Sequence, residues 1–160
     1  MKFIYPQACR KKKTVDDRLK ILFLCTGNSC RSQMAEGFAR HVIGNVVIPF
    51  SAGIEAKGLD PYAVRVMKET GVDISSRHSK NIDEVAGVEF DYCITLCGHA
   101  EENCPVFPAK TKIIHRGFDD PPKLAANAKS EEEIISYYRR VRDEIRKYIE
   151  ILPTFLKQKI

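Results

Sequence analysis

Residues 20–32 read Lys-Ile-Leu-Phe-Leu-Cys-Thr-Gly-Asn-Ser-Cys-Arg-Ser, and this segment is the most informative part of the sequence. Its first five residues form a short apolar run that predicts a strand, and the residues from Arg31 onward predict a helix. A loop between a strand end and a helix start leaves several backbone N–H groups unpaired. Those groups and the helix dipole attract an anion. The sequence therefore predicts an oxyanion-binding loop at residues 25–31.

Cys25 opens this loop and Arg31 closes it, with five residues between them. A thiol at the rim of such a loop ionises readily, because the same field stabilises a thiolate. The planar fork of an arginine can grip an oxyanion, and Gly27 and Asn28 suit unusual backbone angles. A free cysteine can also be a small buried apolar residue, but a structural loop does not need this combination. We predict a thiolate facing a bound tetrahedral oxyanion.

Strand and helix patterns alternate along the rest of the chain. Strands are predicted at residues 20–24, 46–50, 90–96 and 112–115, and helices at about 31–43, 61–70, 81–85 and from about 130 onward. This alternation predicts an α/β fold with three layers, in which a small, about four-stranded parallel sheet is flanked by helices. Residues 1–18 carry no periodicity and are predicted to be a flexible N-terminal extension of a single domain at 19–160.

Composition narrows the classes of function. The 160 residues are 44% hydrophobic and 29% charged, with a net charge of +5. Apolar runs are far too short to span a membrane, and six cysteines without a secretory signal indicate the reducing cytoplasm. The basic runs lack interleaved aromatic residues, which argues against nucleic-acid binding, while the positive balance favours small anionic substrates.

Reactive residues follow three of the predicted strands. Cys25 follows the first strand, Cys97 the third, and Asp119 and Asp120 come soon after the fourth. In a parallel sheet, ligands bind beyond the carboxyl ends of the strands, so we expect these groups to meet at one edge. An aspartate held by the rigid turn at Pro121-Pro122 is a candidate general acid. The alternative, which Asp-Asp-Pro taken alone favours, is a turn signal.

The remaining cysteines differ in their surroundings. Cys97 and Cys104 enclose six mostly polar residues, a spacing that fits neither a zinc site nor a buried pair. They could form a disulfide only if the segment rearranges, as a redox relay requires. Cys93 lies inside a strand and is predicted to be core, Cys30 to be structural rather than catalytic, and Cys9 to be incidental. No metal site is expected.

Four motifs together resemble the thioredoxin-coupled arsenate reductases, which share the fold of the low-molecular-weight protein tyrosine phosphatases. They are residues 25–32, Ser51-Ala-Gly53, Thr95-Leu-Cys97 with Cys104-Pro105, and Gly117-Phe-Asp-Asp-Pro121. The likeness runs from about Lys20 to about Leu156.

The resemblance implies a role for each residue of the loop. Cys25 would attack arsenic, while Arg31 and the backbone N–H groups of the loop would hold the oxyanion. The loop consists of Cys25, Thr26, Gly27, Asn28, Ser29, Cys30 and Arg31. Ser32 would hydrogen-bond the Cys25 thiolate, Asn28 would brace the loop, and Asp120 would protonate the leaving oxygen.

The resemblance also implies a thiol–disulfide relay. Cys97 would attack Cys25 and release arsenite, and Cys104 would then attack Cys97. The resulting disulfide between Cys97 and Cys104 would be reduced by thioredoxin as electron donor, with no tightly bound cofactor. Phosphate and sulfate would compete with arsenate. We expect a monomer that binds neither nucleic acid nor membrane and serves arsenic detoxification.

One departure from the family concerns a cation. Relatives often bind potassium beside the loop through residues that match Asn28, Glu36 and Ser51. A fourth ligand, an aspartate, is replaced by Lys80 in this chain. The ammonium group could take the place of the cation and neutralise Glu36, or Lys80 could be an ordinary exposed lysine. Potassium binding is therefore in doubt.

Two other functions stay open. A phosphatase would hydrolyse phosphotyrosine through a cysteinyl-phosphate intermediate, using the same loop and Asp120. The resemblance implies weak phosphatase activity in any case. As a main role it is disfavoured, because Pro122 and Lys123 follow where phosphatases carry aromatic residues that wall the cleft. The third candidate is a thiol redox sensor without turnover.

Overall fold

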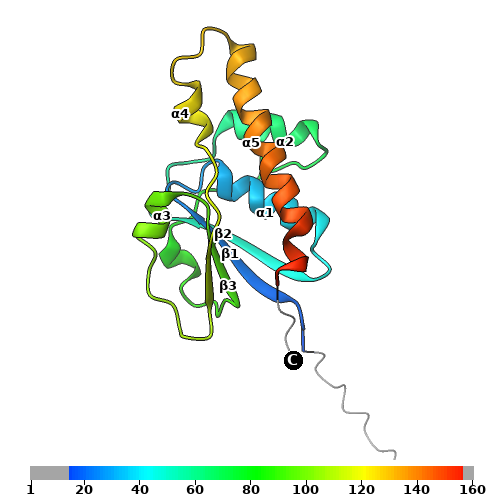
Figure 1. Cartoon of the computed structure of the whole chain (residues 1–160), viewed down its shortest axis with the longest axis vertical. Coiled ribbons are helices and arrows are strands. Elements are labelled where there is room, and N and C mark those ends of the chain that lie inside the picture. The colour runs from blue at the N-terminus through cyan, green and yellow to red at the C-terminus, as the bar shows by residue number, and fades with distance from the viewer. Residues whose placement is uncertain (1–14, 157–160) are drawn as a thin grey trace, which may run out of the picture.

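The computed structural model describes residues 15–156 and contains one four-stranded, fully parallel sheet (Figure 1). The strand order is β2-β1-β3-β4. The strands are β1 (Leu19–Cys25), β2 (Val47–Gly53), β3 (Tyr92–Thr95) and β4 (Lys112–His115). The predicted α/β class and parallel sheet are confirmed. The predicted extension lies largely outside the described residues, as does Cys9.

The register of the strands brings the predicted groups to one edge. Cys25 pairs with Gly53 on β2, and Leu24 pairs with Thr95 on β3. Strand β2 extends through residues 51–53, beyond its predicted end, because these residues pair with residues 23–25 at the end of β1. Strand β3 is shorter than predicted, and its four residues pair with four residues of β4.

The long helices lie where the sequence predicts them, whereas two short ones were missed. The predicted elements are α1 (Arg31–Val42), α2 (Pro61–Glu69), α5 (Glu131–Ile151) and the 3₁₀ turn η1 (Ile82–Val85). The additional elements are α3 (Gly98–Glu102), α4 (Pro121–Ala125) and a final 3₁₀ turn η2 (Leu152–Thr154). Five residues are too few to show a helical period, which explains why α3 and α4 leave no signal in the sequence.

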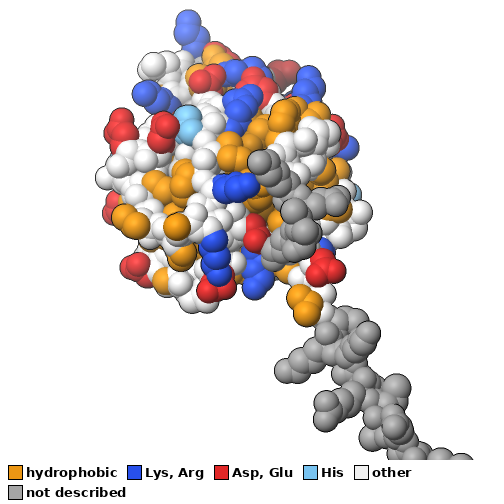
Figure 2. Space-filling model, turned by 60° about the horizontal axis from the view of Figure 1, so that its bottom comes forward, with side chains coloured by type: hydrophobic (Ala, Val, Ile, Leu, Met, Phe, Trp, Pro, Cys, Tyr) orange, Lys and Arg blue, Asp and Glu red, His pale blue; other side chains and the backbone are white. Residues whose placement is uncertain are grey.

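Both faces of the sheet are covered, as a three-layer fold requires. Four consecutive β1 residues, Ile21 to Leu24, are fully buried although their side chains alternate between the two faces. Helices α1 and α5 pack together, with α1 on β1 and β2, while α3 contacts β1 and β3, and η1 contacts β2 (Figure 1). Among the described residues, none of the helices is long and apolar enough to cross a membrane. Acidic and basic side chains are interspersed on the face in Figure 2.

Candidate active site

The loop between β1 and α1 is held in shape by Asn28. This residue is fully buried and has a φ of +48°, in the left-handed region that asparagine tolerates better than most residues. Its side-chain amide donates to Ser32 Oγ at 2.8 Å, and its Oδ1 accepts from the backbone N–H of Lys80 at 2.8 Å. Its carbonyl accepts from Ser79 Oγ at 2.8 Å. These three hydrogen bonds fix the conformation of the loop.

Gly53 explains why the Ser-Ala-Gly motif ends in glycine. A Cβ at this position would lie 2.7 Å from the backbone N of Asn28 and 2.8 Å from the carbonyl oxygen of Thr26. Both atoms are backbone and cannot move aside without distorting the loop. The end of β2 therefore supports the loop by direct backbone contact, which only glycine permits.

Cys25 lies at the end of β1 with its sulfur 2.8 Å from Ser32 Oγ. Because Asn28 donates to the same Ser32 oxygen, the single hydroxyl proton of Ser32 is free to point at the sulfur. An O–H donor aimed at the sulfur stabilises the negative charge of a thiolate. The thiol is also buried, with 3% of the residue exposed, so the protein rather than bulk water surrounds it.

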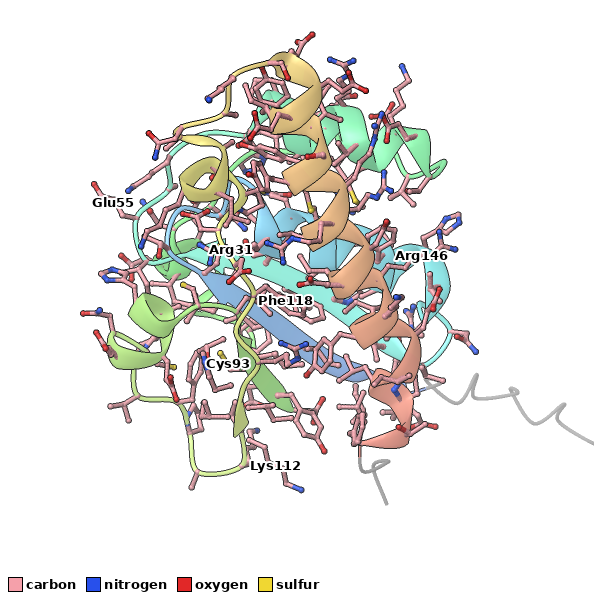
Figure 3. All side chains as sticks on the ribbon, turned by 45° about the horizontal axis from the view of Figure 1, so that its top comes forward. Arg31, Glu55, Cys93, Lys112, Phe118 and Arg146 are labelled. Carbon is pink, nitrogen blue, oxygen red and sulfur yellow. The ribbon has the colours of Figure 1, made fainter. Side chains whose placement is uncertain are left out.

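Arg31, the first residue of α1, is buried and oriented by two contacts. Its Nη1 donates to the carbonyl oxygen of Phe118 at 3.0 Å, and its Nη2 lies 3.5 Å from Asp120 Oδ1. Arg31 and Phe118 lie close together in the centre of Figure 3. Asp119 instead pairs with Arg140 of α5 at 3.1 Å. Of the two aspartates, the structure therefore brings Asp120 to the arginine of the loop.

A cavity of about 700 Å³ opens in front of Arg31. Its lining comprises Arg31, Cys97, Gly98, Gly117, Phe118, Asp119, Asp120, Lys123 and Leu124. The Cys97 sulfur is 3.4 Å from Thr26 Oγ1, next to the residue that follows Cys25. The segments after β1, β3 and β4 thus meet at one edge of the sheet, as expected for the carboxyl ends of parallel strands.

Cys104 is not in this cavity. It is half-buried against the core, two residues beyond the end of α3, and both Cys97 and Cys104 are free thiols. Burial raises the pKa of Cys104, and a hydrogen bond with Cys93 lowers it in part. The predicted disulfide between Cys97 and Cys104 therefore requires α3 to rearrange.

Cys30 and Cys93 have the surroundings of structural residues. Both are buried, and burial is the largest cause that raises the pKa of each thiol. Thiols with a raised pKa stay protonated and are poor nucleophiles. Cys30 is the N-cap of α1, yet its side chain makes no capping bond.

The buried Glu36 carboxylate contacts three cationic side chains. Its Oε2 accepts from Ser51 Oγ at 2.5 Å and lies 3.9 Å from Lys80 Nζ. Its Oε1 is 2.9 Å from Arg40 Nη2 and 3.3 Å from Arg77 Nη1. Burial is the main cause that lowers the pKa of Arg77, and Glu36 opposes it. We call these five residues the Glu36 cluster.

The Glu36 cluster bears on the predicted cation site. Only 20% of the Lys80 side chain is exposed, and it faces Glu36. With both carboxylate oxygens bound by a hydroxyl or by protein cations, the donor set does not fit a potassium ion. Among the described residues, no group of three histidine, cysteine or acidic side chains could hold a metal ion.

Sequence reasoning missed Gln33, Arg40 and Arg77. Gln33 is fully buried, and its amide donates to the Asn28 carbonyl, to Asn28 Oδ1 and to the carbonyl of His78. A polar residue on the core-facing side of α1 was the available signal. Arg40 could have been paired with Glu36 from their spacing of four residues on the predicted helix, whereas Arg77 gives no comparable signal in the sequence.

Comparison with known proteins agrees with this geometry. Residues 20–160 match the family model described as low molecular weight phosphotyrosine protein phosphatase. An arsenate reductase of Halalkalibacterium halodurans is 50% identical over 129 residues, covering 81% of this chain and 91% of the relative. An arsenate reductase of Bacillus subtilis is 51% identical over 125 residues, covering 78% and 88%. A solved arsenate reductase in a phosphate-binding state superposes with a TM-score of 0.66 at 30% identity, covering 87% and 99%.

The fold and the loop define a protein of the phosphatase type, in which a strand-to-helix loop carries a cysteine and an arginine. The chain belongs to the low molecular weight phosphotyrosine protein phosphatase family. Within that family, the relatives at about 50% identity are arsenate reductases.

Proposed function

We propose that this protein reduces arsenate to arsenite through a relay of three cysteines. The observation that carries the proposal is the position of Cys97, whose sulfur borders the cavity beside the loop that holds Cys25. Hydrolysis of a phosphate ester needs only one thiol, whereas reduction of arsenate needs a second one. The names of the relatives at about 50% identity support the same activity.

The first step is attack of the Cys25 thiolate on arsenic. Arg31 and the N–H groups of the loop hold the oxyanion, and the contact between Ser32 and the sulfur stabilises the thiolate before attack. Asp120 gives a proton to the leaving oxygen, which departs as water. The product is an arsenic(V) adduct on the Cys25 sulfur, and no electrons have yet been transferred.

The second step is attack of the Cys97 thiolate on the Cys25 sulfur. A disulfide forms between the two residues, the S–As bond breaks, and its electron pair remains on arsenic. Arsenic(V) becomes arsenic(III), which leaves as arsenite, and two thiols have supplied the two electrons. Thr26, 3.4 Å from the Cys97 sulfur, keeps this thiol next to the loop.

The third step regenerates Cys25. The Cys104 thiolate attacks the Cys97 sulfur, Cys25 leaves as a thiolate, and the disulfide moves to Cys97 and Cys104. Cys104 lies outside the cavity and is partly exposed, so a large dithiol protein can reach the new disulfide there. We propose thioredoxin as this reductant, with the reaction serving arsenic detoxification in the cytoplasm.

Phosphatase activity is the alternative, and it shares the loop and Asp120. The relative solved in a phosphate-binding state favours binding of phosphate to this loop. The rim of the cavity in this chain carries Lys123 and Leu124 rather than a pair of aromatic side chains. Phe118 also lines the cavity but is buried, so a substrate with a phenyl ring would find little stacking surface, and we expect phosphatase turnover to be weak.

The test is arsenate-dependent NADPH oxidation in the presence of thioredoxin and thioredoxin reductase, beside hydrolysis of a chromogenic phosphate ester. We expect sustained oxidation with arsenate, slow ester hydrolysis, and loss of both in Cys25→Ser. Fast hydrolysis without arsenate turnover would identify a phosphatase. Oxidation of the thiols without turnover of either anion would identify a redox sensor.

A further inference from the structure

The imidazole of His115 connects two strands to helix α3. His115 ends β4 and pairs with Thr95 of β3. Its Nδ1 is 2.9 Å from Thr95 Oγ1, and its Nε2 is 3.4 Å from Glu101 Oε2 on α3. A Cβ on Gly117 would lie 3.3 Å from Nε2, so the ring rests against the backbone at Gly117. Thr95 and the backbone at Gly117 thus fix the position of the ring, and Nε2 contacts Glu101 on the helix.

Glu101 lies between Cys97 and Cys104 in the sequence. Its N–H donates to the Cys97 carbonyl at 3.1 Å, and its own carbonyl accepts from the Cys104 N–H at 3.4 Å. The Cys97 sulfur also accepts from the N–H of Ala100 at 3.4 Å, which caps the start of α3. The backbone of α3 therefore joins both cysteines through Glu101.

Helix α3 separates the two cysteines. Its five residues, Gly98–Glu102, alone rise about 7.5 Å along the helix axis, and Cys97 and Cys104 lie beyond its two ends, whereas a disulfide requires Cα atoms within about 7 Å. The hydrogen bonds of α3 must open before Cys97 and Cys104 can bond. Whatever holds Glu101 in place therefore opposes this opening.

Thr95 allows the His115 ring to keep its contact with Glu101 whether the ring is neutral or charged. Its hydroxyl can donate to Nδ1 of a neutral ring, which leaves the N–H of Nε2 to face Glu101. When the ring is charged, both nitrogens are donors, and the hydroxyl can turn toward the Ile114 carbonyl at 3.5 Å. The contact with Glu101 persists in both cases.

We propose that His115 is a positioning residue for the relay. With Thr95, it holds Glu101 and so keeps α3 helical, and Glu101 must leave His115 before Cys104 reaches Cys97. This inference rests on the proposed function, which gives the opening of α3 its role. The pair is exposed to solvent, with 35% and 54% of the His115 and Glu101 side chains accessible, so it can hold the helix without locking it.

The test measures disulfide formation between Cys97 and Cys104 without arsenate. In full-length Cys25→Ser protein, excess oxidised dithiothreitol takes two electrons and two protons from the two thiols, and mapping of the product by mass spectrometry gives the rate. We expect His115→Ala and Glu101→Ala each to raise this rate roughly 2- to 5-fold. The double variant should be no faster than either single one, because both break the same contact.

Glu102→Ala is the matched control, since Glu102 is the exposed neighbour of Glu101 on α3 and has no ion pair within the described residues. His115→Gln, which keeps an N–H donor, should restore part of the slow rate. Hydrogen exchange at the Glu101 and Asn103 amides should speed up in the two alanine variants and stay unchanged in the control. When Cys25 is retained, its rate of alkylation should be the same in His115→Ala, in Glu101→Ala and in the wild type.

Equal rates in all variants, slower rates in the alanine variants, or additive effects in the double variant would overturn the role of His115 while leaving the relay intact. If the disulfide between Cys97 and Cys104 forms in no variant, the relay itself fails and this inference fails with it. The two failures are therefore distinguishable.

Discussion

Asp119 and Asp120 are adjacent in sequence but face different partners. Asp120 lies 3.5 Å from Arg31 in the cavity, whereas Asp119 is paired with Arg140 on α5. A proton donor must reach the oxygen that leaves, and the group next to the arginine of the loop meets this condition. The sequence could propose this role for Asp120 through Pro121, but only the structure separates the two carboxylates.

We therefore expect Asp120→Asn to slow single-turnover release of arsenite by roughly 10²- to 10⁴-fold, the usual contribution of a positioned acid. Asp119→Asn should cost far less, because Asp119 pairs with Arg140 of α5 and not with the arginine of the loop. Rapid quench of wild type and both variants with equimolar arsenate measures the two rates. A larger loss in Asp119→Asn would assign the acid to that residue.

Lys80 leads to a prediction about potassium. Its Nζ is 3.9 Å from Glu36, and Arg40 and Arg77 contact the same carboxylate, so the place of a cation is already filled by protein. We expect the activity of the wild type to change less than about 2-fold with potassium at fixed ionic strength, because Ser51 and three protein cations already occupy both oxygens of the Glu36 carboxylate.

Titration of activity with potassium chloride against a large organic cation tests this, with Lys129→Ala as a control for general charge effects. Lys80→Ala should lower the free energy of unfolding by about 1 kcal/mol or less. Strong activation of the wild type by potassium would show that the ion binds despite the Glu36 cluster.

At the scale of elements, the sequence predicted the long helices and the parallel strands but not the short helices at the site. Helix α5 repeats buried residues such as Tyr138, Val141 and Ile145 at helical spacing over 21 residues, so its pattern is unmistakable. Helices α3 and α4 have five residues each and are formed by tertiary contacts. The Glu36 cluster was only partly predictable: Arg40 follows Glu36 by four residues on the predicted helix α1, but Arg77 comes from the segment between α2 and η1, whose packing the sequence does not reveal.

The segment from Cys97 to Cys104 carries the next prediction. Cys97→Ser and Cys104→Ser should each abolish multiple-turnover reduction of arsenate but leave hydrolysis of a phosphate ester within about 3-fold of wild type, because water rather than a thiol breaks the phosphate adduct. The coupled thioredoxin assay and a chromogenic ester measure the two activities. Cys9→Ser is the matched control, since the sequence predicts this cysteine to be incidental, whereas Cys93 hydrogen-bonds Cys104 and is unsuitable. Normal cycling by either serine variant would show that the order of the relay is wrong.

At the scale of the whole molecule, α1, α2 and α5 pack against one another. The contact between α2 and α5 contains a buried charge, Arg142, whose Nη1 donates to the Val66 carbonyl at 2.9 Å and to Glu69 at 2.8 Å. Arg139 binds the same carboxylate at 2.7 Å. A buried guanidinium needs such partners, because its desolvation would otherwise destabilise the fold. None of these contacts touches the cavity, so they affect stability without touching the chemistry.

Glu69 makes the stability of this layer depend on pH. Hydrogen bonds from Arg139 first and Arg142 next lower its pKa from 4.5 to about 2. A lowered pKa in the folded state means that the carboxylate stabilises the protein above pH 4.5, and that this contribution fades as the pH falls toward 2.

We expect Glu69→Gln to reduce the free energy of unfolding by about 1 kcal/mol at pH 7, a value reduced for the partial exposure of the pair. Urea unfolding at pH 7, 5 and 4 should show a constant difference from wild type at the first two values and a smaller one at pH 4, whereas Glu102→Gln should match wild type throughout. A difference that grows on acidification would contradict the assignment, because it would mean that the protonated form of Glu69 is the one that supports Arg142.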